Sequence, residues 1–214
     1  MSMRKEPSYS VAATQVIALL IVVANFLLPY ISRHLGADWN EAAIALLGTI
    51  AVVILYDGNA GDLGFRRTPL QGWWHWIKIT LWLGLCVALI VLICGAVALA
   101  MGWEIPIRRA NPRFLLYYLL FMGIYAPLVE EVIFRFLLAV ACRSLLGDKG
   151  FILLSGFLFA AAHWGGNPSP ENQVGGFLLA WAFVRSQTIL VPLAMHSAGN
   201  LIALSVQIIN WYVF

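Results

Sequence analysis

Residues 128–135 read LVEEVIFR and place Glu130, Glu131 and Arg135 inside one of the most apolar parts of the chain. The rest of the chain is apolar too, because 62% of its 214 residues are hydrophobic and only 11% are charged. Soluble domains average roughly 45–50% apolar and about 25% charged residues. This composition predicts an all-α, polytopic membrane protein. Charged side chains within membrane segments are costly and mark functional sites, which makes this stretch the first candidate for one.

Apolar segments of about 20 residues can cross a bilayer, and the chain has room for a transmembrane bundle of about seven to eight helices. We expect one integral membrane domain over residues 1–214. The run from Phe114 to Leu146 would be about 50 Å long as a helix of about 1.5 Å per residue, too long for one upright crossing, and Pro127 is the expected bend. The expected spans are 11–31, 41–56, 79–101, 128–146, 151–164, 174–186 and 189–214.

The basic residues indicate membrane topology rather than a nucleic-acid partner. The formal net charge is only +3, and the lysines and arginines are dispersed along the chain. If residues 114–146 cross once, most basic residues lie on the side of the amino terminus, and basic loops favour the cytoplasm. We therefore expect a cytoplasmic amino terminus, membrane lipids as surroundings, and no nucleic-acid partner.

Four polar side chains from three separate spans fall into one depth band. Glu130, His163, His196 and Asn200 lie roughly 10–24 Å below the expected cytoplasmic ends of their spans, at about 1.5 Å per residue. Burying each of them separately in a bilayer would be costly. We therefore expect them to meet in a common polar cavity within the membrane.

The spacing of the charged residues in LVEEVIFR assigns them different environments. Glu131 and Arg135 are four residues apart and share a helix face, which predicts an intramembrane ion pair. Glu130 points about 100° away from that face and has no local cation. A carboxylate in this situation can take a proton from a water molecule and pass it on.

The histidines of the later spans complete this set. His163 can serve next to the same water as a second base, an acid or a metal ligand. His196 and Asn200 are four residues apart and share a face, and an Asn amide can donate a hydrogen bond to a developing oxyanion. Phe159, four residues before His163, is expected to pack beneath it.

Two other interpretations apply to intramembrane histidines and carboxylates. Such residues also join helices by hydrogen bonds, relay protons or line a transport path. A proton-coupled transporter of paired architecture would contain related halves, and we find no internal repeat. The protease motifs HExxH, GxGD and GxSxG are absent, and Ser155 lacks the neighbours of a nucleophilic serine. Any hydrolysis would then depend on water.

Three motifs in order along successive membrane segments give a family resemblance. EEVIFR (130–135) fits EExxxR, FAAAH (159–163) fits FxxxH, and HSAGN (196–200) fits HxxxN. The chain resembles the CPBP group of CAAX proteases and bacteriocin-processing or self-immunity proteins, also called the Abi or type II CAAX prenyl endopeptidase family, with a catalytic core at about residues 112–214.

The resemblance implies an intramembrane endopeptidase. Glu130 and His163 would activate a water, while His196 and Asn200 would bind the oxyanion or orient that water. Glu131 and Arg135 would shape the site. The substrate would be a peptide or protein, lipidated or otherwise associated with the membrane, and the location the bacterial inner membrane. The alternative is a non-enzymatic bacteriocin-immunity or membrane interaction protein of the same fold.

The same residues fit either a site with a catalytic metal or a site without one. Members of the family are often labelled metalloendopeptidases, and Glu130, His163 and His196 make a three-ligand set of the kind that a catalytic zinc uses. A glutamate-activated water without a metal explains the same residues, so the cofactor is either a divalent metal such as zinc or none. We favour the metal-free form, because Glu131 could act as the additional base only by leaving Arg135.

Overall fold

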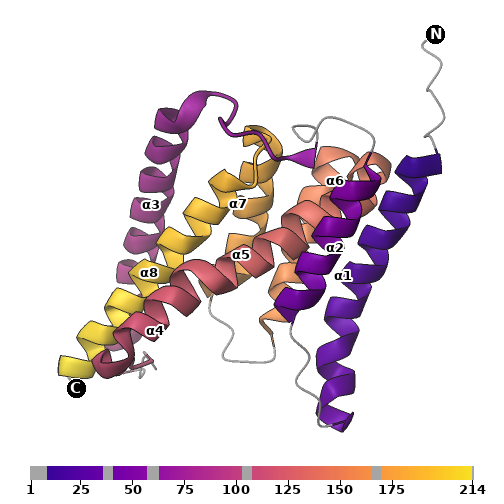
Figure 1. Ribbon diagram of the computed structural model, residues 1–214. Coiled ribbons are helices and arrows are strands. Elements are labelled where there is room, and N and C mark those ends of the chain that lie inside the picture. The colour runs from indigo at the N-terminus through magenta and orange to yellow at the C-terminus, as the bar shows by residue number, and fades with distance from the viewer. Residues whose placement is uncertain (1–8, 36–40, 57–62, 103–107, 165–169, 214) are drawn as a thin grey trace.

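The computed structural model describes residues 9–35, 41–56, 63–102, 108–164 and 170–213. These residues are helical apart from short connections, and their one β contact is an isolated bridge between Phe65 and Thr188. The expected all-α class is therefore confirmed. The helices are α1 (Tyr9–Leu35), α2 (Glu41–Leu55), α3 (Gly72–Ala100), α4 (Leu115–Leu120), α5 (Ala126–Glu131), α6 (Leu138–Ala162), α7 (Pro170–Ser186) and α8 (Leu190–Val213) (Figure 1). Three short segments complete them: the 3₁₀ turn η2 (Pro112–Phe114) and the π-helical segments η3 (Phe121–Tyr125) and η4 (Val132–Leu137).

The main apolar core lies where α1, η4, α6 and α7 meet. Helix α1 packs against α2 and α6, and α6 packs against α7. Small residues of α1 and α7 let these helices approach the aromatic residues of η4 and α6. The buried members of this core include Ala18, Val22, Val52, Phe136, Leu137, Phe151, Ala180 and Phe183.

The outer surface of the bundle is apolar. Large hydrophobic side chains of α1, α2, α3 and α4 are exposed, among them Leu20, Leu47, Leu92 and Leu116. Extended exposed apolar surface of this kind is rare in soluble monomers. It is what a helical protein presents to lipid.

Length and composition support the same conclusion for individual helices. Among the described residues, Gly72–Ala100 and Leu190–Tyr212 are long and apolar enough to cross a membrane, while Val11–Leu27 and Ala43–Leu55 are apolar but shorter. These findings support a helical membrane protein. They do not extend to the seven to eight spans expected from the sequence.

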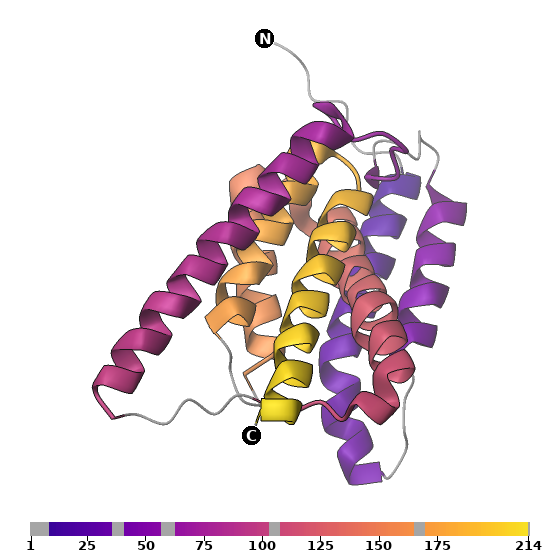
Figure 2. The same ribbon diagram turned by 90° about the vertical axis from the view of Figure 1, so that its left-hand side faces the viewer.

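Helix α3 is attached to the bundle near one end and diverges from it along its length (Figures 1 and 2). The attachment is Trp76, a buried residue whose indole Nε1 donates a hydrogen bond to the Leu70 carbonyl at 2.8 Å and whose ring lies 5.6 Å from that of Trp181. Ala182 and Val191 complete this cluster. Because α3 is apolar on all sides beyond Lys78, lipid is the natural environment of that part.

The expected bend at Pro127 is wrong. The chain stays helical from Leu115 through Pro127, and α4 and α5 follow one oblique course across the bundle (Figure 1). Proline inside a helix removes one backbone hydrogen bond and crowds the preceding turn. Here the π-helical η3 lies directly before Pro127 and changes the hydrogen-bond register at that turn. The long segment therefore fits by tilting rather than by breaking.

The break comes at Gly147 instead. Its backbone has φ 67° and ψ 177°, a conformation that glycine adopts far more readily than other residues, and it separates the two parts of α6. The sequence placed the boundary between the spans 128–146 and 151–164 at this point, and that boundary is confirmed. The second part of α6 is short and ends at Ala162 next to His163.

Both π-helical segments offer a backbone carbonyl to another helix. The Met122 carbonyl in η3 accepts a hydrogen bond from Asn200 Nδ2 at 2.9 Å, and the Phe134 carbonyl in η4 accepts one from Ser155 Oγ at 2.9 Å. A π turn shifts the backbone out of the α-helical register, so its carbonyls are open to side-chain donors. Ser155 is fully buried and therefore holds η4 against α6.

We predict that Ser155→Ala lowers the free energy of unfolding by about 1–3 kcal/mol, because it removes a buried hydrogen bond to the Phe134 carbonyl. Ser205→Ala is the matched control, since Ser205 Oγ also donates to a backbone carbonyl, that of Leu201, but on the exposed side of α8. Unfolding in mixed detergent micelles, followed by circular dichroism, measures both. Equal effects of the two substitutions would contradict the assignment of Ser155.

Candidate active site

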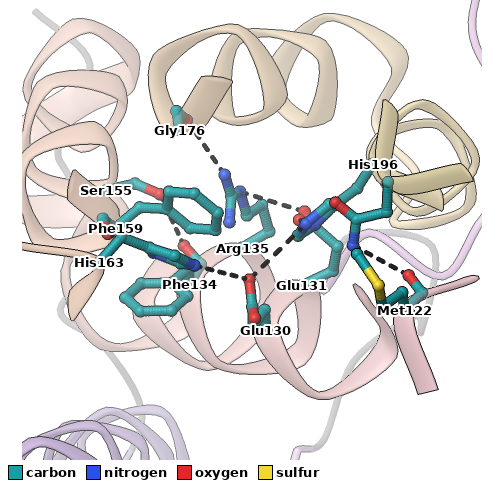
Figure 3. Close-up of polar contacts among 11 residues, drawn as sticks. Met122, Glu130, Glu131, Phe134, Arg135, Ser155, Phe159, His163, Gly176 and His196 are labelled. Atoms are coloured by element: carbon teal, nitrogen blue, oxygen red, sulfur yellow. Dashed lines mark hydrogen bonds and ion pairs between the residues drawn. The ribbon is translucent and has the colours of Figure 1, made fainter. Parts of the chain in front are cut away.

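Polar side chains from α5, η4, α8 and the end of α6 gather in one cluster (Figure 3). Helix α5 supplies Glu130 and Glu131, η4 supplies Arg135, His163 follows the last turn of α6, and His196 projects from α8. Residues far apart in the sequence thus meet at one place, as the sequence predicted for Glu130, His163 and His196. The spacing of hydrophobic and polar residues along α5 and α8 directs these side chains inward, because the outer faces are apolar.

Glu131 and Arg135 form a buried ion pair. Arg135 Nε lies 3.1 Å from Glu131 Oε2, and both side chains are 0% exposed. Neither of these two atoms makes an aligned hydrogen bond, so the contact is mainly electrostatic. The guanidinium is further held by Nη2, which donates to the Gly176 carbonyl at 3.1 Å, and by the ring of Phe159, whose centroid lies 4.7 Å from Cζ. The ion pair expected from the sequence is present.

The other oxygen of Glu131 contacts His196. Glu131 Oε1 lies 2.8 Å from His196 Nδ1. A carboxylate ionised beside an arginine can only accept hydrogen bonds, so Nδ1 carries the proton and the neutral imidazole has its lone pair on Nε2. Sequence reasoning missed this contact, since Glu131 and His196 are 65 residues apart and no spacing rule joins them.

Glu130 faces both histidines. Its Oε2 lies 3.8 Å from His163 Nε2 and 3.7 Å from His196 Nε2. His163 Nδ1 lies 2.8 Å from the Phe159 carbonyl, which can only accept, so the neutral imidazole of His163 also presents the lone pair of Nε2 to Glu130. Three acceptor atoms therefore face each other at distances too long for direct hydrogen bonds.

The site is partly accessible. Glu130 and His163 are 25% and 26% exposed, whereas Glu131 and Arg135 are fully buried. The two acids of the EE pair thus have separate environments, as predicted. They nevertheless converge on one residue, because they reach the two different ring nitrogens of His196.

Phe159 does more than pack under His163. Its ring stacks on His163 with a centroid distance of 4.4 Å, and it meets the edge of His196 at 5.7 Å. Its carbonyl fixes the tautomer of His163, and its face contacts Arg135. The interpretation as ordinary packing was too narrow, because this buried side chain touches three of the polar residues.

Asn200 lies one helical turn beyond His196 on α8, as expected, but its amide is partly engaged. One N–H of Nδ2 donates to the Met122 carbonyl. The second N–H of the same nitrogen is left for another acceptor. Asn200 therefore ties α8 to η3 while retaining one donor.

The proposed metal ligands Glu130, His163 and His196 do not pass a geometric test for a metal site. In the part of the chain that the structure describes, no group of three or more His, Cys, Asp or Glu side chains is arranged to hold a metal ion. The histidine donor atoms do face the carboxylate, but they are not gathered as a ligand shell.

A comparison with protein-family profiles matches residues 112–202 to Type II CAAX prenyl endopeptidase Rce1-like proteins. The comparisons with curated proteins and with solved structures gave no match. The matched segment contains all three motifs on which the resemblance rests, and it begins in η2 and ends in α8. The resemblance to the CPBP group of intramembrane proteases is thereby confirmed for this segment.

We predict that Arg135→Ala destabilises the protein by about 3–5 kcal/mol and lowers its folded yield, because Glu131 is left as a buried charge without a cation. The matched control is Arg143→Ala. Arg143 Nε pairs with Asp148 at 2.8 Å, but both side chains are solvent accessible, so this loss costs about 0–1 kcal/mol. Yield and detergent unfolding midpoints of the two variants measure the difference. A wild-type yield and midpoint for Arg135→Ala would contradict a stabilising ion pair.

Proposed function

We propose that the chain is a membrane-embedded endopeptidase that hydrolyses a peptide bond with water, because residues 112–202 match Type II CAAX prenyl endopeptidase Rce1-like proteins. The observation that carries the proposal is the position of Glu130 Oε2, 3.8 Å from His163 Nε2 and 3.7 Å from His196 Nε2. These separations are too long for direct hydrogen bonds, and a water molecule held beside the three acceptor atoms can donate to two of them.

In the first step, the water attacks the carbonyl carbon of the scissile bond. Glu130 accepts one proton of the water, and Nε2 of His163 accepts a hydrogen bond from the other, which orients the oxygen for attack. The fixed tautomer of His163 supports this role, because its Nδ1–H is already bound to the Phe159 carbonyl. A new C–O bond forms, and the carbonyl oxygen becomes an oxyanion.

The oxyanion needs hydrogen-bond donors. Asn200 offers its second amide N–H, and His196 donates from Nε2 after Glu130 has passed to it the proton taken from the water. Glu131 stabilises such an imidazolium through Nδ1, as the buried carboxylate of a catalytic triad does for its histidine. The intermediate then collapses: the C–N bond breaks, and the same proton returns from His196 through Glu130 to the leaving amine, which leaves His196 neutral again.

The substrate that we propose is a peptide or protein chain at or within the membrane, lipidated or not. Residues 1–214 would form one membrane domain in a bacterial inner membrane, with residues 112–214 as catalytic core and the remaining helices completing seven to eight spans. A cytoplasmic amino terminus agrees with the basic residues Arg66 and Arg185. Arg66 follows Phe65, which forms the bridge with Thr188 ahead of α3, and Arg185 lies in the last turn of α7 just before Thr188.

We predict that Glu130→Gln abolishes cleavage, with a loss of about 10²- to 10⁴-fold in kcat, because an amide cannot accept the proton of the water. The assay is cleavage of a library of membrane peptides by purified protein in liposomes, read by mass spectrometry. Asp148→Asn, which neutralises an exposed carboxylate, serves as the control and should cleave as the wild type does. Equal cleavage by wild type and Glu130→Gln would refute the role of Glu130.

If neither the wild type nor the variant cleaves while both bind the same peptide, the results favour the alternative function, a non-enzymatic immunity or membrane interaction protein. This outcome is distinct from an inactive preparation, since binding of a labelled peptide reports a folded protein. Mass spectrometry and binding are therefore run on the same samples.

We predict that cleavage persists after treatment with a strong chelator, because the proposed steps need only a water molecule and the side chains of the chain. Metal content by plasma mass spectrometry and activity are measured on the same sample before and after chelation. Loss of cleavage on chelation, restored by zinc, would instead make Glu130, His163 and His196 the ligands of a catalytic metal.

A further inference from the structure

Two neighbouring glycines of α7 differ in their surroundings. Gly175 is half-buried, and a Cβ built on it would meet nothing within 4 Å. Gly176 is buried, and a Cβ there would lie 2.8 Å from Cβ of Phe159 and 3.1 Å from Cγ and Cδ1 of its ring. The absence of a side chain at Gly176 therefore decides how closely α7 approaches α6.

Phe159 is unable to yield to such a side chain. It is 2% exposed, and its ring is held between the guanidinium of Arg135 and the imidazole of His163. The closest contact is with the Cβ of Phe159, which moves only with the backbone of α6. A methyl group at position 176 would therefore push the two helices apart by several tenths of an ångström or more.

This close approach places the Gly176 carbonyl in the active site. It accepts the hydrogen bond from Arg135 Nη2 at 3.1 Å (Figure 3), and an increase of about half an ångström would take the two atoms beyond hydrogen-bond distance. Arg135 pairs with Glu131, and Glu131 holds His196 Nδ1. The backbone of α7 is thus the first member of a chain of contacts that ends at His196.

We propose that Gly176 is a positioning residue of the active site: its missing side chain lets its carbonyl hold Arg135, and through Arg135 and Glu131 it sets the orientation of His196. The inference rests on the proposed function, since the orientation matters for cleavage. Gly176 touches no substrate in this scheme. Its substitution should therefore lower kcat and leave KM unchanged.

The experiment compares four variants with the wild type on the peptide that the wild type cleaves fastest in the library. Gly176→Ala is the test, and Gly175→Ala is the matched control with the same chemical change one residue away. Gly156→Ala controls for packing, because a Cβ at Gly156 would meet ring atoms of Phe177, a half-buried side chain that can rotate away without moving the backbones of α6 and α7. Arg135→Lys keeps a positive charge beside Glu131 but lacks the fork that also reaches Gly176.

Activities are expressed per folded protein, with the folded fraction taken from size exclusion and the thermal midpoint. We expect Gly176→Ala to lose about 10- to 100-fold in kcat at unchanged KM, the scale of a small misplacement of catalytic groups. Gly175→Ala should match the wild type. Gly156→Ala should lower the thermal midpoint but retain its kcat. Arg135→Lys should lose kcat as Gly176→Ala does, and it tests the inference if Gly176→Ala fails to fold.

Three results would overturn the inference. Gly176→Ala could cleave as fast as Gly175→Ala, Gly156→Ala could lose as much kcat as Gly176→Ala, or Arg135→Lys could keep full activity. The second result would mean that Gly176 matters only for the packing of α6 against α7. A wild type that cleaves nothing overturns the proposed function and the inference with it, whereas an active wild type with an equally active Gly176→Ala overturns the inference alone.

Discussion

The ion pair between Glu131 and Arg135 is the contact on which the centre of this protein depends. Two full charges without access to water are tolerated only when each has partners on several sides. Here the partners come from three other elements: His196 on α8, the Gly176 carbonyl on α7 and the Phe159 ring on α6. The pair therefore determines how these helices assemble around α5 and η4. Its removal would disturb every helix that carries a polar residue of the site.

The contrast between exterior and interior follows from the membrane. The outer faces of α1 to α4 carry leucine, isoleucine and aromatic residues, whereas polar groups are concentrated among α5 to α8. In an apolar environment, a polar group is stabilised most when it pairs with another polar group. The π-helical segments follow the same rule, because Asn200 and Ser155 bond to carbonyls that these turns offer. The irregular backbone beside the acids is thus stabilised by side chains of the neighbouring helices.

The sequence predicted the helical class, the ion pair and the meeting of Glu130 with both histidines. Helical periodicity and the cost of burying a charge in the membrane can both be judged from the sequence without knowing how the helices pack. It did not predict the contact of Glu131 with His196 or the carbonyl of Gly176 beside Arg135, because these join residues far apart in the chain. Pro127 illustrates another limit. Proline disfavours the interior of a helix, as expected. The π-helical turn before Pro127, which the composition does not reveal, nevertheless allows the helix to continue.

The clearest consequence of these contacts is that His163 and His196 each carry a proton on Nδ1 and present the lone pair of Nε2 to Glu130. Nitrogen-15 NMR of protein labelled in its four histidines, with the signals assigned through His163→Ala and His196→Ala, observes these tautomers directly. The arrangement predicts, for the neutral form of both residues, a protonated Nδ1 and an unprotonated Nε2. A proton on Nε2 of a neutral His196, with Nδ1 bare beside Glu131, would contradict it.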